Sequence, residues 1–451
     1  MSKIFGAGRY DKKFDYRTKK EIKKRQFVKI KQALNHAYKN SKFYRNLYRK
    51  NSITPKDIKN LEDFKNIPVV SRRDLYDYNW EIPAVSKNKW IDISVTSGTT
   101  RKPTFIPYTR GDLSRMAKIT SILHNIAGIK RGDIVQITYP LGTGMWVAGF
   151  HNWLGLYNNN ICSLRFGPGF TESQLNNALT LGSSVFLGSP SFMARLKAFA
   201  DSRREFRNFK PRLICVCGQN IVNSDFTCNK LGRQLKKLWR GTVIKPVYGA
   251  SEGPICGTVC DKGVGYHIPG EFFYLEILDK DNRNLEEGKK GRLVITSLGT
   301  EAFPLIRYAI GDISFLMKGR CSCGWSSARM GPISTRIDEL LKFKGLLINP
   351  YEISETVSGL EGINNYYLQA FNDTDLMDKL RIIIAVEDKK SKNEKERVGS
   401  LVRKTIKSKF RINTEILIES REAVNKKIFF TEKGESRRKP VRFFDIRKKR
   451  R

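Results

Sequence analysis

The sequence lacks any apolar run that approaches the length of about 20 residues needed to cross a bilayer. Its opening segment, MSKIFGAGRYDKKFDYRTKK, also lacks the apolar stretch of a signal peptide. We therefore expect a cytoplasmic protein without a membrane span. In that compartment its eight cysteines would be free thiols or metal ligands rather than disulfides.

Acidic residues are scarce beside basic ones, 44 against 83, which gives a formal net charge of +39. Two explanations stay open: an acidic partner, such as nucleic acid, an anionic surface or a polymer, or a solvated lysine-rich coat. The sequence has no RGG tract, zinc-finger spacing or aromatic RNA-binding signature, which favours the coat over a nucleic-acid role. The oligomeric state, a homodimer included, stays open as well.

The hydrophobic content of 40% and the length of 451 residues predict a folded chain with two or three packed units. Short β-rich runs such as DIVQITYP and RLICVCG alternate with amphipathic helices, which predicts parallel α/β sheets covered on both faces. The pattern turns antiparallel in FYLEILDKDNRNLEEGKKGRLVITSL, and a further β-α-β series follows. The predicted fold is a large N-terminal α/β domain, residues 1–335, with parallel sheets and a barrel-like part, followed by a small C-terminal α+β domain, residues 336–451.

The segment TSGTTRKPT, Thr96 to Thr104, combines glycine, several hydroxyl groups and a lysine. Backbone N–H groups and hydroxyls in such a loop can surround an anion, and the lysine adds positive charge. The loop is not a Walker A motif, because GxxxxGK[ST] is absent and strand-like stretches flank it. A phosphate-binding loop and a plain hairpin loop both remain open from these residues.

Four segments, in order, resemble motifs of the adenylate-forming superfamily, which includes acyl-CoA synthetases, luciferases and peptide-synthetase adenylation domains. TSGTTRKPT is similar to its phosphate loop, and YGASE to its aromatic-Gly-x-Thr/Ser-Glu motif. IRYAIGD is similar to its Tyr-x-x-Gly-Asp motif, and TRIDELLKFKGLLINPYEI to its hinge. The opening helices, CSCGW and the closing Lys-x-x-Arg-x-x-Asp-x-Arg pattern resemble the phenylacetate–CoA ligase branch, which also contains capsule-biosynthesis homologues and enzymes that adenylylate a deazaflavin cofactor.

The resemblance implies that the protein activates a carboxylate with ATP, through an acyl-adenylate, and transfers it to coenzyme A as a phenylacetate–CoA ligase does. The small C-terminal domain would then be mobile. One alternative is transfer to a non-CoA acceptor, as in surface polysaccharide synthesis or cofactor adenylylation. Another alternative is an inactive basic homologue that binds polyanions. The segment TYPLGTGMWVAGFHNWLG lies where the branch builds its acyl pocket, with Tyr139 and Trp146 as candidate walls for a flat aromatic or small apolar acid.

The resemblance also assigns nucleotide-binding residues. Tyr248, with Gly249 beside it, would stack on adenine, Ser251 would approach the α-phosphate, and Asp312 would accept hydrogen bonds from the ribose. The residues that would bind the β- and γ-phosphates are Thr96, Ser97, Gly98, Thr99, Thr100 and Lys102.

Three residues would carry the catalytic roles. Glu252 would hold Mg²⁺, a hard cation that prefers carboxylate oxygens. Lys439, followed by Arg442, aligns with the lysine that bridges carboxylate and phosphate during adenylation, although the tail is so basic that a shifted alignment would select Arg438. Arg336, with Asp338, fits the hinge.

Three positions depart from the family pattern: Arg101 replaces a glycine of the phosphate loop, Gln219 an acidic residue, and Thr335 the hinge glycine. These departures leave open a weakened or altered nucleotide preference, and also a catalytically inactive homologue.

Four metal-binding side chains form a last candidate site. Cys260 and His267 lie in CDKGVGYH, and Cys321 and Cys323 follow in CSCG. Three thiolates and an imidazole suit tetrahedral Zn²⁺ with no open position, so we expect a structural site. Some branch members carry a similar Cys-x₆-His and Cys-x-Cys arrangement; the alternative is an ordinary loop histidine beside reduced thiols. The cysteines expected in the core are Cys162, Cys215 and Cys217.

Overall fold

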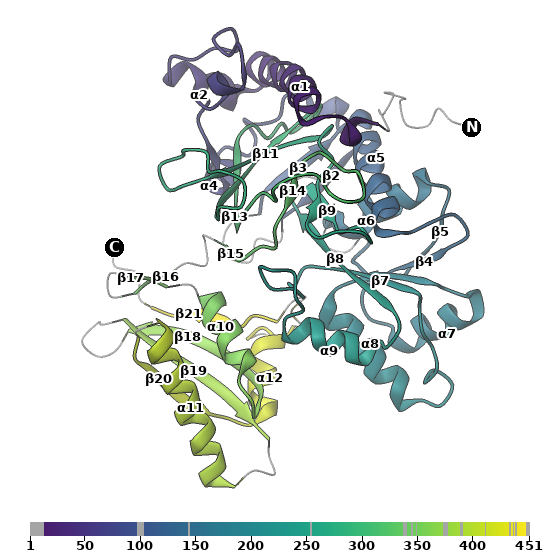
Figure 1. The fold of residues 1–451 in the computed structure, drawn as a ribbon, viewed down its shortest axis with the longest axis vertical. Helices are drawn as coiled ribbons and strands as arrows, with labels where there is room; N and C mark the ends of the chain where they lie inside the picture. Colours follow the sequence, from purple (N-terminus) through teal and green to yellow (C-terminus); the bar gives the residue numbers. More distant parts are fainter. Residues whose placement is uncertain are drawn as a thin grey trace. The chain divides into compact units, whose positions relative to one another are not determined.

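The computed structural model divides the chain into two compact units, Met1–Ser334 and Thr335–Arg451, one residue from the division predicted at 335/336 (Figure 1). The residues that it describes are 13–96, 103–142, 145–252, 255–336, 341–343, 346–348, 350–372, 378–387, 391–410, 412–432, 434–435, 437 and 440–447.

The first unit contains a large mixed sheet with the strand order β14-β10-β9-β8-β7-β6-β4-β5. The pairs β5–β4, β4–β6, β6–β7 and β7–β8 are parallel, and β8–β9, β9–β10 and β10–β14 are antiparallel. The bounds of its strands are β4 Ile134–Ile137, β5 Cys162–Arg165, β6 Val185–Gly188, β7 Leu213–Cys217, β8 Val243–Ala250, β9 Ile255–Thr258, β10 Tyr266–His267 and β14 Arg329–Met330.

Helices cover both faces of the parallel part. Phe186 and Ile214 pack with α7 (Thr171–Leu181), α8 (Pro190–Ser202) and α9 (Lys230–Leu238) on one face. Val185 and Leu213 pack with α5 (Arg110–Ala127) and α6 (Val147–Asn158) on the other. Successive strand residues alternate between these two cores, as the pleat requires, so the predicted doubly covered α/β arrangement is confirmed.

A second sheet has the order β1-β13-β12-β11, with β11 Phe273–Leu278, β12 Gly291–Ser297, β13 Tyr308–Ser314 and β1 Val70–Ser71. The predicted hairpin of β11 and β12 is confirmed, and β13 continues the antiparallel order with a register shift between Arg292 and Val294. This sheet is the part that the sequence predicts to be barrel-like. The N-terminal segment supplies β1, which pairs in parallel with β13.

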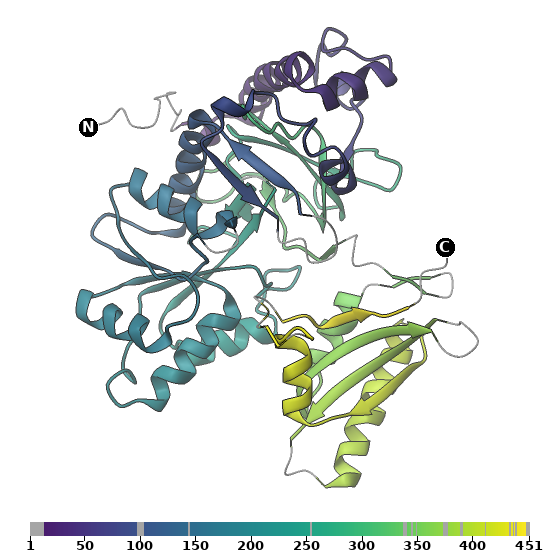
Figure 2. The ribbon, with the colours of Figure 1, turned by 180° about the vertical axis from the view of Figure 1, so that it is seen from behind.

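The N-terminal segment is mostly helical, as predicted, and packs in one core with the second sheet and α5 (Figure 2). Thr18 caps the first helix with a reciprocal capping box to Glu21, which satisfies N–H groups that would otherwise lack partners. Its helices are α1 Lys19–Asn40, α2 Lys42–Lys50, α3 Leu61–Phe64 and α4 Arg72–Asp77, and two short 3₁₀ turns span Phe14–Tyr16 and Lys87–Lys89.

The second unit has its own core, built on the sheet order β20-β19-β18-β21. Its predicted β-α-β elements are present, and the tail adds β21, which pairs in parallel with β18. Their bounds are β15 Thr335–Arg336, β16 Leu341–Phe343, β17 Leu346–Ile348, α10 Pro350–Gly359, β18 Ile363–Asn372, β19 Asp378–Val386, α11 Lys392–Phe410, β20 Thr414–Ile418, α12 Arg421–Phe429 and β21 Phe443–Asp445.

One core prediction is wrong. Cys215 is buried, but Cys162 is exposed, because β5 is the edge strand of the large sheet and no strand of the described residues pairs beyond it. An apolar run in sequence predicts a strand but does not reveal whether that strand is central or at an edge.

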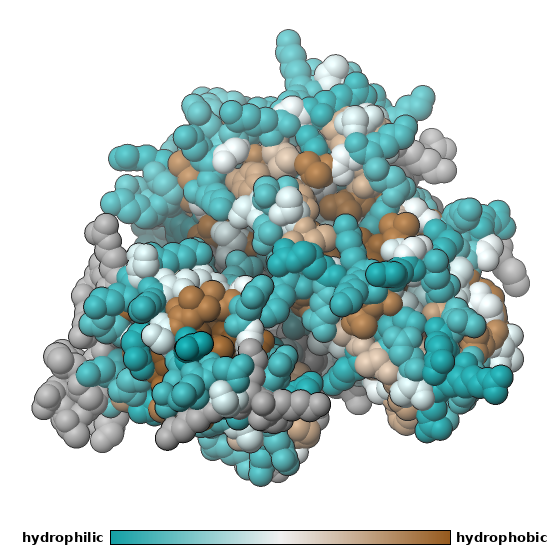
Figure 3. All heavy atoms as spheres, turned by 60° about the horizontal axis from the view of Figure 1, so that its bottom comes forward, coloured by the Kyte–Doolittle hydropathy of each residue, from teal (hydrophilic) through white to brown (hydrophobic). Residues whose placement is uncertain are grey.

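Among the described residues, no helix combines the length and apolar character required to cross a bilayer. On the face drawn in Figure 3, hydrophilic side chains surround separate apolar patches.

Candidate active site and metal-ligand cluster

The predicted phosphate loop joins the two strands of a hairpin. β2 (Asp92–Val95) and β3 (Phe105–Tyr108) pair antiparallel, which confirms the strands predicted on either side of the loop. Beyond β2, Thr96 closes the loop base: its N–H donates to Thr104 O, and its Oγ1 accepts from Thr104 N, each at 3.0 Å. Thr96 is buried, whereas Ser97, Gly98, Thr99, Thr100, Arg101 and Lys102 lie outside the described residues.

The N-terminal segment holds this hairpin at its base. The Asn79 side chain pairs with the backbone of Phe105 in both directions, donating to its O at 2.8 Å and accepting from its N at 2.9 Å. Trp80 stacks on Trp90 and on Phe105, with ring centroids 6.2 and 5.6 Å apart. The start of the loop-bearing hairpin is therefore fixed by residues that precede it in the chain.

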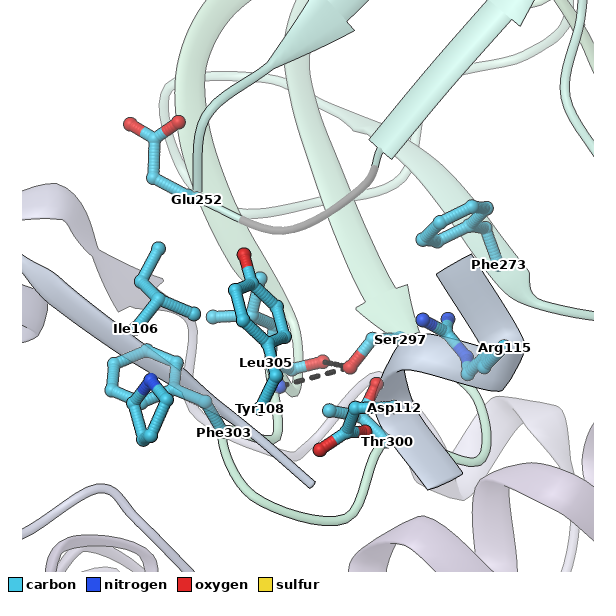
Figure 4. Close-up of a pocket in the computed structure, with 11 residues that line it drawn as sticks. Ile106, Tyr108, Asp112, Arg115, Glu252, Phe273, Ser297, Thr300, Phe303 and Leu305 are labelled. Atoms are coloured by element: carbon cyan, nitrogen blue, oxygen red, sulfur yellow. Dashed lines mark hydrogen bonds between the residues drawn. The ribbon is translucent and has the colours of Figure 1, made fainter. Parts of the chain in front are cut away.

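Glu252 lies close to the hairpin. It follows β8, is 7% exposed, and lines one small cavity together with Ile106 and Tyr108 of β3, as Figure 4 shows. Burial raises the pKa of Tyr108. The negative charge of the nearby Glu252 carboxylate raises it further, because it disfavours the phenolate. The Tyr108 hydroxyl is hydrogen-bonded to Ser94 Oγ at 2.7 Å.

Tyr248 and Asp312 are in direct contact, although 64 positions separate them in the chain. Tyr248 Oη donates to Asp312 Oδ2 at 2.8 Å, and both side chains are buried. Gly311, just before Asp312 in β13, has φ of 92°, a conformation that favours glycine because it has no Cβ. The glycine of the Tyr-x-x-Gly-Asp motif thus lies at the irregularity of β13, where the register with β12 shifts directly before the acidic side chain.

Two residues that the sequence analysis missed connect these parts. Arg72, the first residue of α4, places Nη2 3.3 Å from Glu252 Oε1. Arg307 is buried with φ of 44°, bonds Glu276 through Nε and Nη2 at 3.1 and 3.0 Å, and donates to the backbone oxygens of Lys65 and Ile67. Arg72 lies in a charged stretch that gave no signal, and Arg307 lies inside the IRYAIGD motif but was not assigned a role there. The Arg72–Glu252 and Arg307–Lys65 contacts each cross more than 100 positions of sequence.

The remaining residues that the sequence analysis singled out in the first unit lie as follows. Gly249 lies in β8, and Ser251 follows it. Gln219 Oε1 accepts from Ser191 N at 3.1 Å, at the start of α8. Tyr139 is buried and donates to Gly188 O, and Trp146 directly precedes α6.

In the second unit, Lys439, Arg438 and Asp338 lie outside the described residues, while Arg336 and Thr335 form β15. Arg442 is described: it donates to Asn365 Oδ1 and to Tyr366 O at 2.6 and 2.7 Å, and its guanidinium lies 4.6 Å from the Tyr366 ring centroid. These contacts fix the tail just before β21. Arg442 therefore has a structural role, because it anchors the tail to Asn365 and Tyr366 of its own unit.

The predicted metal ligands come together. The ligand atoms of Cys260, His267, Cys321 and Cys323 all lie within 4.8 Å of one another. Adjacent strands explain this, because His267 in β10 pairs with Thr258 of β9 on one side and with Arg329 of β14 on the other. Cys260 follows β9, and the Cys321–Cys323 turn precedes β14.

The donor set fits Zn²⁺. Cys260 Sγ and Cys321 Sγ are 3.8 Å apart, and Cys323 Sγ and His267 Nε2 are 3.3 Å apart. A tetrahedral ion with Zn–S bonds of about 2.3 Å requires sulfur atoms about 3.8 Å apart. His267 Nδ1 lies 3.1 Å from Gly265 O, which leaves Nε2 facing the thiols, and burial lowers the His267 pKa to about 4, so the imidazole is neutral as a ligand must be.

Arg329 connects the loop after β9, which carries Cys260, to the loop before β14, which carries Cys321 and Cys323. Its Nη1 donates to Val264 O at 2.7 Å, and its Nη2 donates to Lys318 O and Gly319 O at 3.1 and 3.3 Å. Lys245 Nζ, buried beneath the first loop, pairs with Asp261 Oδ1 at 2.5 Å. These protein contacts therefore hold the two loops near their positions, in addition to the proposed metal ion.

Known proteins share this sequence and this fold. The chain is 27% identical over 384 residues to a phenylacetate–coenzyme A ligase of Thermus thermophilus, with 84% of each chain covered. It is 26% identical over 406 residues to that of Escherichia coli, covering 88% of this chain and 91% of the relative. These similarities support the resemblance of the chain to the adenylate-forming superfamily. No protein-family model matches the chain.

Solved structures agree on the fold. A 2-hydroxyisobutyryl-CoA ligase in the postadenylation state, in complex with 2-HIB-AMP, superposes with a TM-score of 0.80 at 19% identity, over 96% of this chain and 91% of that one. ATP-bound MatB from Rhodopseudomonas palustris gives a TM-score of 0.57 at 13% identity, over 78% and 67%. The predicted fold class is therefore confirmed.

Proposed function

We propose that the protein is an ATP-dependent carboxylate–CoA ligase that works through an acyl-adenylate. The observation that carries this proposal is the Tyr248–Asp312 hydrogen bond, which joins two of the four ordered motifs at atomic distance. The hairpin of the phosphate loop and Glu252 line one cavity in the same unit. Relatives that cover most of the chain are phenylacetate–coenzyme A ligases, so an aromatic or small apolar acid is the substrate class we propose.

Each residue has a task that its chemistry suits. Asp312 accepts hydrogen bonds from the ribose, and its bond from Tyr248 orients the ring that stacks on adenine. Glu252 is a buried carboxylate, a hard oxygen donor suited to Mg²⁺, which when bound would offset phosphate charge. The predicted loop residues donate to the outer phosphates, and Lys439 of the mobile second unit bridges the carboxylate and phosphate oxygens.

The two half-reactions then follow. The carboxylate oxygen attacks the α-phosphorus of ATP, and pyrophosphate leaves. The thiol of coenzyme A next attacks the acyl carbon, and AMP leaves. The net charge of +39 raises the local concentration of both polyanionic substrates.

The deciding experiment measures pyrophosphate release for a panel of aromatic and small apolar acids, with and without coenzyme A, and identifies acyl-CoA by mass spectrometry. We expect turnover that depends on ATP, acid and coenzyme A. Turnover that ignores coenzyme A would identify a different acceptor. No ATP-induced increase in the melting temperature, together with salt-sensitive polyanion binding, would identify an inactive homologue.

We further propose that Cys260, His267, Cys321 and Cys323 hold one structural Zn²⁺. The four ligands leave no open position, so the ion would clip the β9–β10 hairpin to the turn before β14. Metal analysis of protein prepared without chelator is expected to give about one zinc per chain.

A further inference from the structure

A second cavity, with a volume of about 160 Å³, lies in the first unit. Ile244 and Pro246 of β8 line it, and the turn after β7 adds Val222 and Phe226. The remaining walls come from α9 and from the loop between β9 and β10. A cavity of about 150 Å³ in another protein binds benzene. The cavity beside β8 is therefore large enough for one aromatic ring.

This cavity is separate from the nucleotide-binding motifs. Of the residues that the structure describes, those that line it include none of Tyr248, Glu252 and Asp312. The ring of Phe226 lies 6.0 Å from that of Tyr266, and the Tyr266 ring lies 6.4 Å from that of Tyr248, measured between centroids. One aromatic ring thus stands between the wall of the cavity and the tyrosine proposed to stack on adenine.

Phe226 is held in a strained conformation at the cavity wall. Its φ is 66°, in the left-handed region that bulky residues rarely adopt. The turn imposes this conformation, because Phe226 N donates to Asn223 O at 2.9 Å and Asn223 N donates to Thr227 O at 2.8 Å. Backbone strain of this kind is concentrated at sites that bind ligands. A ligand site at this turn is consistent with that strain.

The cavity carries charge of one sign only. Lys236 of α9 is the one charged residue among the described residues that line it. Lys236 is exposed, and no hydrogen bond or ion pair joins it to another described residue. Val264, which also lines the cavity, is 49% exposed, so these two residues mark the side that opens to solvent. An ammonium at the mouth of an apolar cavity favours an anion with an apolar body.

We propose that this cavity binds a small aromatic carboxylate, with the ring inside and the carboxylate directed towards the Lys236 ammonium. The volume selects a single ring, the apolar walls remove the ring from water, and the lysine selects a negative charge. For so small a ligand we expect a dissociation constant of about 1 mM or below. The proposal does not depend on the ligase function, because none of the residues assigned to nucleotide or metal forms part of the cavity.

A thiol in the cavity wall allows a local test on the full chain. Cys228 lines the cavity and is partly exposed. We expect saturating para-fluorobenzoate to slow the alkylation of Cys228 by iodoacetamide severalfold, as measured by mass spectrometry of the peptides. The exposed thiol of Cys162, on the edge strand of the large sheet, should react at an unchanged rate. Alkylation of Cys228 at the same rate with and without the acid would overturn the proposal.

Fluorine NMR titration of the same acid gives a second measurement, which does not require Cys228 to react. Lys236→Met should weaken binding about two- to fivefold, as the loss of a solvent-accessible ion pair does. Lys237→Met, at the next lysine of α9, is the matched control and should bind as the wild type does. Para-fluorobenzyl alcohol, which has the same ring without the charge, should bind Lys236→Met and wild type equally.

A variant at the opening separates this cavity from any other place where an aromatic acid binds. Val264→Phe puts a larger ring at the half-exposed mouth, and the binding that it removes is the contribution of the cavity. Undiminished binding in Val264→Phe, equal affinity of Lys236→Met and wild type for the acid, or para-fluorobenzylamine binding as tightly as the acid would each overturn the proposal. If the protein released no pyrophosphate with any acid, the ligase function would fail, while protection of Cys228 would still establish this site.

Discussion

Tyr248 Oη donates a hydrogen bond to Asp312 Oδ2 at 2.8 Å, with both side chains buried. The bond joins the YGASE strand of the large sheet to the IRYAIGD strand of the second sheet. A charged acceptor makes such a bond worth about 1.5–3 kcal/mol, so it orders both side chains before any nucleotide binds.

The first prediction concerns this pair. Asp312→Ala removes the proposed ribose acceptor together with the hydrogen bond from Tyr248 Oη, so we expect ATP affinity to fall about tenfold or more. Tyr248→Phe should cost less, since the ring remains. Calorimetric titration with ATP·Mg²⁺ measures both. Tyr157→Phe on the exposed surface of α6 is the control, and equal ATP affinity in Asp312→Ala and wild type would contradict the site assignment.

The second prediction concerns Glu252. Glu252→Gln keeps the shape but removes the charge that holds the metal, so pyrophosphate release should fall by about 10²-fold or more. Steady-state release at saturating ATP is the measurement. Glu287→Gln, at an exposed carboxylate paired with Lys19, should keep wild-type activity. If Glu252→Gln retained full activity, Glu252 would have no metal-binding role.

The third prediction concerns the cysteine cluster. Cys321→Ser with Cys323→Ser should abolish bound zinc and lower the melting temperature by several degrees, because two of the four ligands are lost. Atomic absorption and thermal unfolding test this. Cys162→Ser, at the exposed edge strand, should retain one zinc. Full metal content in the double variant would exclude the proposed ligands.

The fourth prediction concerns Arg307. Arg307→Ala leaves the Glu276 carboxylate buried without its cation and removes two bonds to the N-terminal segment, so we expect unfolding free energy to fall by about 3–5 kcal/mol. Denaturant unfolding of the first unit measures it. Replacing both partners, as Arg307→Met with Glu276→Leu, should recover part of the loss. A cost below about 1 kcal/mol for Arg307→Ala would show that the pair does not hold the segment.

The fifth prediction concerns pH. His124 is 4% exposed, and burial lowers its pKa to about 4, from an ordinary value of 6.5. Between these values the unfolded chain binds the extra proton, so the contribution of His124 is complete above pH 6.5 and is lost as the pH falls towards 4. The slope is at most about 1.4 kcal/mol per pH unit. Melting temperatures from pH 4.5 to 7 should fall less steeply for His124→Gln, and parallel curves would contradict the burial argument.

The fold class and the site motifs were readable in the sequence because each depends on local chemistry. Alternation of short apolar runs with amphipathic helices predicted the doubly covered sheet. The sequence also predicted the candidate metal-binding group of Cys260, His267, Cys321 and Cys323, whose side chains the strands bring together. Gly311 is likewise a local requirement, because its φ of 92° favours glycine.

Contacts between distant segments could not be read in this way. Nothing around Arg72 indicates that it meets Glu252, because that contact depends on β1 joining β13 at one register. The Arg307–Glu276 pair depends in turn on how β11, β12 and β13 pair. The exposure of Cys162 likewise depends on which strand ends the sheet. Local patterns determine which elements form and what chemistry they carry, but burial and ion pairing arise when the chain packs, since each depends on partners far away in sequence.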